Sequence, residues 1–199
     1  GQENREPAYD TIEAFAEETT MPLTIGGGIR TTEQIQRLLN LGADKIAINT
    51  SAVADPKFIR QGAEMFGSQC IVVSIDAIQR EGARYEVLIS GGYEATGLDV
   101  VDWAKKVENM GAGEILLTSV DRDGTMDGFD IELIRMVADA VKIPVIASGG
   151  CGLLIDLVDA VNQGHASAVA ASSIFAFTDN KPMKATSFMQ TQGVHVRPI

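Results

Sequence analysis

The chain has 199 residues, 45% hydrophobic and 22% charged, a composition typical of one globular domain and unlike that of disordered, collagen-like or coiled-coil proteins. Its 27 acidic and 16 basic residues give a net charge of −11, which argues against non-specific binding to nucleic acid or to an anionic membrane surface. The apolar runs all fall short of the ~18 residues that span a bilayer, so no membrane segment is expected.

Amphipathic helices and short apolar strands alternate along the chain. Most apolar runs are rich in Val, Ile, Leu and Ala without strict alternation, which favours parallel strands covered on both faces. Strands that alternate with helices indicate an α/β fold with a parallel sheet. In chain order we predict helix 8–19, strand 22–25, helix 32–41, strand 45–49, helix 56–66, strand 70–76, helix 100–110, strand 114–119, helix 131–141, strand 143–148, helix 153–163 and strand 166–171.

One hairpin and several end signals complete the predicted elements. Residues 84–89 and 93–96 are expected to pair across a double-glycine turn. No linker or low-complexity tract divides the chain, so we predict a single domain over 1–199. Three end signals stand out: Asp55 as the N-cap of the helix that starts at Pro56, Gly111 as a C-cap, and Gly164 as the end of a later helix.

Cysteine and histidine usage indicates neither disulfides nor metal binding. Cys70 and Cys151 lie in apolar or glycine-rich surroundings, which suggests free thiols in a reducing compartment and a cytoplasmic location. The opening GQENREPAYD lacks the features of a signal or transit peptide. His165 and His195 have no partners at ligand spacing, so we expect neither a metal nor another cofactor.

An internal repeat relates residues 21–53 to residues 143–175. Each copy reads as strand, Gly-Gly, helix, glycine, strand and a small hydroxyl residue, which indicates a duplicated fold. The coinciding pairs are Pro22 and Pro144, Gly27 and Gly149, Gly28 and Gly150, Gly42 and Gly164, Thr50 and Ser172, and Ser51 and Ser173.

The offset of the repeat predicts a larger fold than the chain contains. A duplicated fold of roughly 244 residues matches the ~250 residues typical of a (βα)₈ TIM barrel. The six predicted strands would then be strands three to eight, with strands one and two, about 50 residues, outside this chain. We therefore expect a fragment that by itself neither closes its barrel nor turns over.

The Gly-Gly turns of the two copies are candidate anion sites. Glycines after a strand let backbone N–H groups approach an anion, and a following helix N-terminus adds a favourable dipole. One such turn is most often a plain tight turn. Two matching turns, each with hydroxyl residues after the neighbouring strand, favour a ligand with a phosphate at each end. Such sites need no lysine and suit an acidic protein.

Two further strand ends carry candidate catalytic or substrate-binding groups. Asp76 ends the run IVVSID, and the carboxyl ends of the strands are where a barrel places its active site. Desolvation there would raise the pKa of its carboxyl group toward a useful acid/base range. A structural cap or ion pair is the alternative. After the strand that ends near Thr118, Asp123-Gly124 is expected to form a loop over the substrate. The alternative there is an Asx turn with an Asp121–Arg122 surface pair.

Two opposite charges lie at the other end of the predicted strands. Lys45 and Glu114 each begin a strand that then turns wholly apolar, so both should lie at the bottom of the barrel. From their spacing alone, rim charges that solubilise the base are the favoured interpretation.

Together these motifs resemble the cyclase subunits of imidazole glycerol phosphate synthases, enzymes of histidine biosynthesis. The matching segments are PLTIGGGIRT, GADKIAINTSAV, FGSQCIVVSIDA, GAGEILLTSVDRDGTMDGFD, IPVIASGGCG and ASAVAASSIF. They span nearly the whole chain. The sister isomerase family, which acts on ProFAR, shares pieces such as RDGT, but it usually has Gly-Trp after the fifth strand, where this chain reads SGGYEATG.

The resemblance implies a (βα)₈ barrel of the ribulose-phosphate-binding type with a glutaminase partner docked on its base as a heterodimer. Ammonia from the partner would convert the bisphosphate substrate PRFAR into imidazole glycerol phosphate and AICAR. Asp76 matches the family's catalytic aspartate on strand five, and the second catalytic aspartate belongs to strand one. Lys45 and Glu114 match half of a charged ammonia gate.

The substrate-binding positions implied by the resemblance fall in three groups. They are Gly27, Gly28, Asn49 and Thr50 for one phosphate, Gly149, Gly150, Ala171 and Ser172 for the other, and Thr118, Asp123 and Ser148 for the rest of the substrate.

Two segments depart from the cyclase pattern. REPAYDTIEAFAEETTMPL and FAFTDNKPMKATSFMQTQGVHVRPI resemble a paralogous branch associated with surface-glycan genes, in which an ammonia-dependent subunit helps to amidate an N-acetyl sugar. A second alternative is an inactive bisphosphate-binding scaffold that docks a partner. The presence of Asp76 argues against the scaffold.

Overall fold

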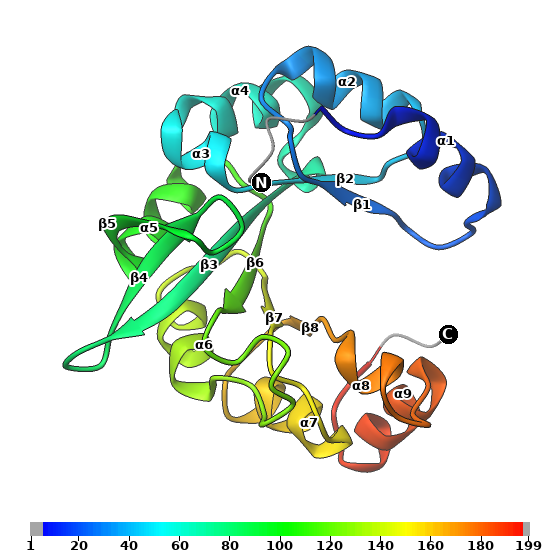
Figure 1. Ribbon diagram of the computed structural model, residues 1–199, viewed down its shortest axis with the longest axis vertical. Coiled ribbons are helices and arrows are strands. Elements are labelled where there is room, and N and C mark those ends of the chain that lie inside the picture. The colour runs from blue at the N-terminus through cyan, green and yellow to red at the C-terminus, as the bar shows by residue number, and fades with distance from the viewer. Residues whose placement is uncertain (1–5, 197–199) are drawn as a thin grey trace.

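A curled sheet with helices on its convex side forms the body of the protein (Figure 1). The structure, a computed structural model, describes residues 6–196. Six strands of the sheet are parallel and follow one another in chain order, and a hairpin pairs with the third of them. The six are β1 (Thr24–Gly26), β2 (Lys45–Ile48), β3 (Ile71–Arg80), β6 (Glu114–Ser119), β7 (Val145–Ser148) and β8 (Ala168–Val169).

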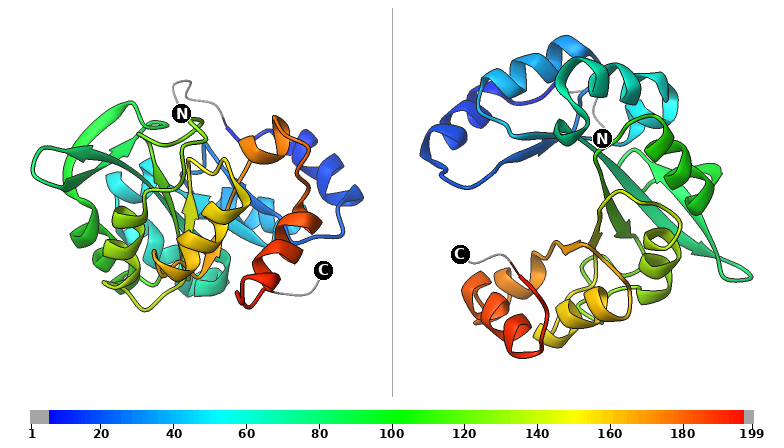
Figure 2. Two further views of the ribbon diagram at one scale, coloured as in Figure 1. Left: turned by 90° about the horizontal axis from the view of Figure 1, so that it is seen from below. Right: turned by 180° about the vertical axis from the view of Figure 1, so that it is seen from behind.

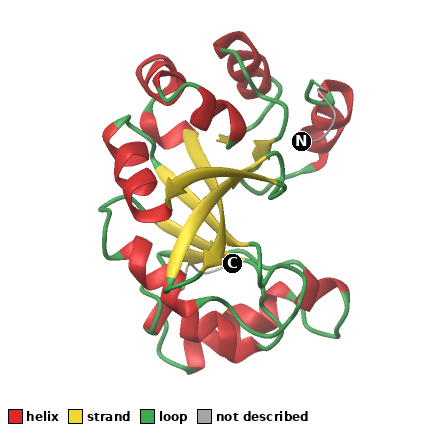
Figure 3. Ribbon diagram, turned by 60° about the vertical axis from the view of Figure 1, so that its left-hand side comes forward, coloured by secondary structure: helices red, strands yellow, loops and turns green. Residues whose placement is uncertain are grey.

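Helices connect the strands and cover the outside of the sheet, as Figure 3 shows. They are α1 (Tyr9–Glu18), α2 (Thr32–Asn40), α3 (Thr50–Ala54), α4 (Lys57–Phe66), the 3₁₀ turn η1 (Ser68–Cys70), α5 (Val100–Asn109), α6 (Ile131–Ala138), α7 (Leu154–Asn162), α8 (Ser173–Ala176) and α9 (Pro182–Thr191). In Figures 1 and 2 the sheet curves from β1 to β8 into an open ring, and within residues 6–196 these two strands do not pair. The predicted α/β class is confirmed, with the form of a partial TIM barrel.

Burial alternates along the strands because only one face of the sheet is covered by helices. Ile46, Val73, Ile75 and Leu117 are fully buried against helices, whereas most residues of the concave face, such as Ser74 and Leu116, are only partly buried, with Val72 at the start of β3 as an exception. The prediction of strands covered on both faces is therefore wrong for the described residues. It failed because apolar residues such as Leu116 occupy some concave positions too, which hides the alternation in the sequence.

Local capping explains where several elements begin and end. The side chain of Asp99 accepts hydrogen bonds at the start of α5, and α5 ends just before Gly111, whose φ of 97° supports the predicted C-cap. The prediction for Asp55 is off by one residue: the N-cap position of α4 is Pro56, while the Asp55 carboxylate accepts the N–H of Lys57 at 3.0 Å.

The predicted hairpin is confirmed, but it is larger than expected. β4 (Arg84–Ile89) and β5 (Glu94–Asp99) pair antiparallel, and β3 runs past Asp76 to Arg80 and pairs with β4 as well. The result is a three-stranded antiparallel hairpin extension, defined as residues 77–99, that stands out from the parallel sheet (Figure 1). The strand prediction stopped at Asp76 because the polar residues beyond it carry no apolar pattern.

Within residues 6–196, three α-helices and the 3₁₀ turn η1 are absent from the predicted elements. α3 and α8 are single turns directly after β2 and β8, and α9 begins with Pro182 at its first position. Such short or weakly amphipathic segments give little periodic signal. The predictions for the opening residues 1–5 and the last residues 197–199 lie outside the described residues.

Neither cysteine forms a disulfide, and Cys151 is buried. Burial raises the pKa of its thiol to about 12. Across residues 6–196, none of the helices has the length and apolar character that crossing a membrane requires.

Candidate functional site

Three polar side chains form a row at the carboxyl ends of the central strands. The register pairs Asp76 of β3 with Thr118 of β6, and Thr118 with Ser148 of β7. Neighbouring parallel strands lie about 4.8 Å apart, so these three residues stand side by side. All three are partly buried on the concave face. The structure thus brings together three residues that the sequence had singled out separately.

Asn49 extends this row on its other side. It directly follows β2, and its Nδ2 donates a hydrogen bond to Oδ2 of Asp76 at 3.0 Å. Its Oδ1 is buried and receives no hydrogen bond from any residue in the described part of the chain. The resemblance placed Asn49 in a phosphate site. In the structure its amide faces the Asp76 carboxylate.

The environment of Asp76 favours the protonated carboxyl group. Burial raises its pKa above the ordinary value of 3.8, and the negative charge of Asp123 adds to the rise. The amide of Asn49 opposes this effect but is the smallest of the three. A carboxyl group whose pKa lies closer to neutrality is suited to give and take protons, which supports the acid/base role predicted for it.

Asp123 lies in the loop that follows β6. Its N–H donates to the carbonyl of Ser119 at 2.9 Å, and its side chain is exposed near Asp76. The alternative of an Asp121–Arg122 surface pair is wrong. The Asp121 carboxylate instead accepts the N–H of Gln79 at 2.7 Å, and Arg122 reaches the carbonyl of Asp127 at 3.5 Å.

The first Gly-Gly turn connects β1 to α2. Gly27 and Gly28 have φ values of 100° and 71°, which favour glycine, and a Cβ at Gly27 would meet no atom within 4 Å. Gly27 therefore serves the backbone conformation and leaves open space above the turn. Thr50, after β2, begins α3 and is exposed.

The second Gly-Gly turn connects β7 to α7 and is more crowded. A Cβ at Gly150 would collide with the carbonyl oxygen of Gly128, and the Gly128 N–H donates to the carbonyl of Gly150 at 2.8 Å. The loop after β6 thus packs on this turn. Ala171 and Ser172 connect β8 to α8, and Ser172 is the N-cap of that helix.

The two copies of the repeat therefore match in structure as well as in sequence. Each has a turn with two glycines at positive φ and a single helical turn, α3 or α8, after the neighbouring strand. In strand order one copy spans β1 and β2 and the other β7 and β8, so Asp76 on β3 lies between them.

One hydrogen bond near the first copy has no signal in the sequence. The hydroxyl of Thr50 accepts the N–H of Ser90 at 3.0 Å, which joins the hairpin extension to the start of α3. Ser90 has a φ of 58°, an uncommon conformation for a residue other than glycine.

Lys45 and Glu114 form an ion pair at the amino ends of β2 and β6, on either side of β3. Their side chains are 32% and 21% exposed, less than expected for solvated rim charges. They point toward each other on the concave face, at the opposite end of the strands from Asp76.

The described residues offer no metal centre: within 6–196, no three His, Cys, Asp or Glu side chains gather closely enough to hold a metal ion. The sequence interpretation also missed a buried contact of Tyr85 with Asp130. An aspartate directly before an amphipathic helix was the available signal for Asp130, as an N-cap.

One known protein family matches most of this chain. The family model described as histidine biosynthesis protein matches residues 1–179 of the 199-residue chain.

Proposed function

Because the chain belongs to the histidine biosynthesis protein family, we propose that it is the cyclase subunit of an imidazole glycerol phosphate synthase. The family consists of histidine-biosynthesis enzymes of isomerase and cyclase type on a (βα)₈ scaffold. In the proposed reaction, ammonia delivered by a glutaminase subunit converts PRFAR to imidazole glycerol phosphate and AICAR.

One observation carries this proposal: a half-buried carboxyl group lies between two matching glycine turns. In the order of the sheet, β3 with Asp76 lies two strands from β1, which leads into the first glycine turn. It also lies two strands from β7, which leads into the second. A substrate with a phosphate at each end would have its middle over Asp76. Backbone N–H groups at turns and helix starts bind phosphate without basic side chains, which agrees with the net charge of −11.

Asp76 would supply acid/base catalysis at the centre of the substrate. Adding ammonia, closing the imidazole ring and releasing AICAR all require proton transfers. A carboxyl group with a raised pKa is protonated for a larger fraction of the time near neutral pH and can exchange a proton with the reacting atoms. Thr118 and Ser148, beside it in the row, offer hydroxyl groups that would orient the substrate.

The position of the ion pair between Lys45 and Glu114 supports ammonia entry at the opposite end. Between this pair and Asp76, the concave face of the central strands carries small or apolar side chains, Ser74 and Leu116. Neutral ammonia would cross such a surface without being protonated by an acidic group there.

Substitution of Asp76 tests the catalytic assignment. In the full-length protein, Asp76→Asn keeps the size of the side chain but removes the titrating group. We expect kcat for PRFAR with ammonium to fall by about 10²–10⁴-fold, the usual value of a general acid or base. Asp102→Asn on α5, an exposed carboxylate away from the row, is the matched control and should leave kcat unchanged. Unchanged turnover by Asp76→Asn would overturn the assignment.

Substitution of Lys45 tests the ammonia gate. In the complex with the glutaminase, Lys45→Ala leaves Glu114 unpaired at the entrance, so glutamine-dependent turnover should fall more than turnover with free ammonium. Lys105→Ala, an exposed lysine on α5, is the control. Equal losses with both nitrogen sources would argue against a gate.

The two segments that resemble the glycan-associated branch define the competing function. They cover α1 near the start of the chain and α9 near its end. If the purified full-length protein binds a bisphosphate but does not convert PRFAR with ammonium, the amidation paralogue or a binding scaffold replaces the cyclase.

A further inference from the structure

The hairpin extension, residues 77–99, is attached to the loop that follows β6. We call residues 120–130 the β6–α6 loop. It carries Asp123, whose charge acts on Asp76, and it lies between the end of β6 and the first turn of α6. Nothing in the proposed chemistry uses the extension itself, so its contacts with this loop call for an explanation.

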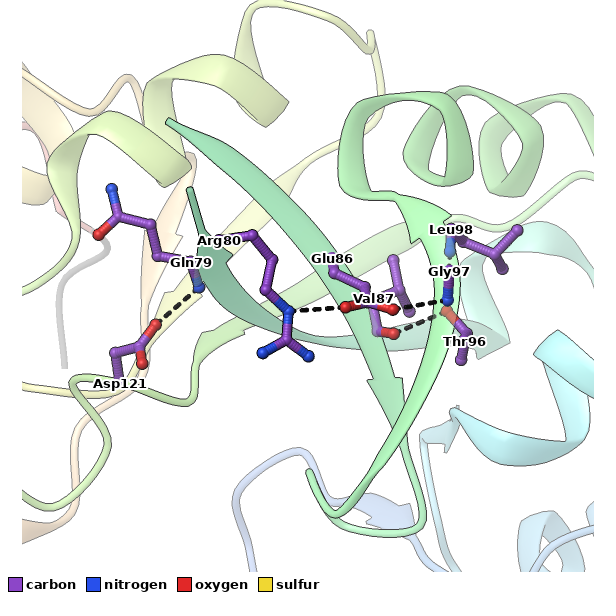
Figure 4. Close-up of polar contacts among 8 residues, drawn as sticks. All are labelled: Gln79, Arg80, Glu86, Val87, Thr96, Gly97, Leu98 and Asp121. Atoms are coloured by element: carbon purple, nitrogen blue, oxygen red, sulfur yellow. Dashed lines mark hydrogen bonds and ion pairs between the residues drawn. The ribbon is translucent and has the colours of Figure 1, made fainter. Parts of the chain in front are cut away.

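The start of the loop is attached to β3 by two hydrogen bonds. The N–H of Val120 donates to the carbonyl of Ala77 at 2.9 Å. The Asp121 carboxylate accepts the N–H of Gln79 at 2.7 Å, which Figure 4 shows at the side of the extension. The acceptor, the carbonyl of Ala77, and the donor, the N–H of Gln79, both lie within three residues of Asp76. The two hydrogen bonds therefore attach the loop to the strand that carries the candidate catalytic group.

The end of the loop is attached to β4 by a buried hydroxyl group. Tyr85 is 2% exposed, and its Oη donates to Oδ1 of Asp130 at 3.0 Å. The same oxygen of Asp130 accepts the N–H of Leu133 at 3.1 Å and so caps α6. Burial, together with the charge of Asp130, raises the pKa of Tyr85 above its ordinary value, so the phenol stays protonated and continues to donate.

The middle of the loop is held on its other side. Asp123 donates its N–H to Ser119 at the end of β6, and Gly128 donates to Gly150 at the second Gly-Gly turn. The loop therefore lies between the extension and that turn, with Asp123 in its first half. Losing the attachment at either end would leave the loop held by these middle contacts alone, so Asp123 could move relative to Asp76.

We propose that Tyr85, acting through Asp130, is a positioning residue that holds the β6–α6 loop in the shape that keeps Asp123 beside Asp76. Its catalytic consequence rests on the proposed function, whereas the attachment of the loop does not. The hairpin extension is then a support for the active site, and Asp121 is the second point of attachment.

Tyr85→Phe tests this inference because it removes only the hydroxyl group and keeps the buried ring. The matched control is Thr96→Val in β5, which removes another hydroxyl of the extension, one that donates to the carbonyl of Val87 at 2.7 Å and does not touch the loop (Figure 4). Amide hydrogen exchange of residues 120–130 in the full-length protein is the first measurement. We expect about tenfold faster exchange in Tyr85→Phe, the factor that one net hydrogen bond contributes, and no change in the control.

Steady-state kinetics with PRFAR and ammonium are the second measurement. A positioning role lowers kcat by about tenfold with a smaller change in KM, since the loop acts on the reacting centre more than on the phosphates. Asp121→Ala, an exposed position that is not expected to prevent folding, should have the same two effects.

The outcomes separate the inference from the proposed function. Unchanged loop exchange in Tyr85→Phe and Asp121→Ala overturns the positioning role, whatever the activity. Faster loop exchange with unchanged kcat overturns the link to catalysis. Absence of PRFAR turnover in the unsubstituted protein overturns the proposed function, while the exchange data still decide whether Tyr85 holds the loop.

Discussion

At the scale of single residues, the position of Asp76 sets it apart from the other carboxylates of the chain. It is the carboxyl group of the row that Asp76 forms with Thr118 and Ser148. Burial raises its pKa, and the nearby negative charge of Asp123 raises it further. Its ionised form is therefore unfavourable in the folded protein. Such a cost at a functional position is common, because groups arranged for catalysis are seldom arranged for stability.

The raised pKa of Asp76 predicts that Asp76→Asn is more stable than the unsubstituted protein near neutral pH. A group whose folded pKa lies above its unfolded value of about 3.8 contributes stability below that value and loses the contribution as pH rises through the folded pKa. Removing the charge should thus raise Tm by a few degrees at neutral pH, and the difference should shrink as pH falls toward about 3.8. Thermal unfolding followed by circular dichroism at several pH values measures this. A lower Tm at neutral pH would contradict it.

At the scale of elements, the helices differ in how firmly their ends are held. The first turn of α5 is capped by Asp99, whose carboxylate accepts the N–H groups of Val101 at 2.9 Å and Asp102 at 3.2 Å. By contrast, α1 has no side-chain cap, and none of its residues is fully buried. Its first residue, Tyr9, has the guanidinium group of Arg37 from α2 stacked over its ring. The helix that follows the hairpin extension is therefore much better fixed than the helix that precedes β1.

The cap of α5 predicts a measurable loss of stability in Asp99→Ala. Two N–H groups of the first turn would lose their acceptor, which should lower the free energy of unfolding by about 1 kcal/mol. Asp102→Ala is the control: it lies in the same first turn and is exposed, and it interacts only with the helix dipole, a smaller effect of about 0.5 kcal/mol. Urea denaturation compares the two variants, and an equal loss in both would show that the cap contributes nothing of its own.

At the scale of the whole molecule, the centre and the two ends of the curled sheet differ in support. β3 and β6 are paired on both sides, and Ile75 and Leu117 are fully buried between the sheet and the helices. Within the described residues β1 pairs only with β2, and β8 only with β7. Strand pairing and side-chain burial are thus most complete at β3 and β6, the strands that carry Asp76 and Thr118.

This difference predicts a gradient of local stability in the 199-residue chain. Amide hydrogen exchange should be slowest in β3 and β6 and fastest in β1, β8 and α1, because local opening follows burial and the number of paired neighbours. Peptide-level exchange measured by mass spectrometry under native conditions resolves these segments. Equal protection of the central and the outer strands would contradict the gradient.

Much of this organisation was predictable from the sequence because it depends on local patterns. Apolar runs alternating with amphipathic stretches indicated the parallel α/β sheet, and the repeat indicated two equivalent glycine turns. Asp76 and Thr118 could be selected because each ends an apolar run, whereas Ser148 was indicated only by the resemblance to the cyclase family. The length of β3 and the helix α9 were not predictable, since polar or weakly amphipathic segments take their structure from the neighbours on which they pack.

By itself, then, the sequence determined the fold class and the residue types at the strand ends, because periodicity and turn residues act over a few positions. Only the tertiary structure decided which of these residues meet. Register between strands placed Asp76, Thr118 and Ser148 in one row. Packing of segments distant in sequence turned Asn49 toward Asp76 and joined Tyr85 to Asp130. Contacts of this kind depend on how the sheet curls and on which loop covers it, and no local pattern encodes them.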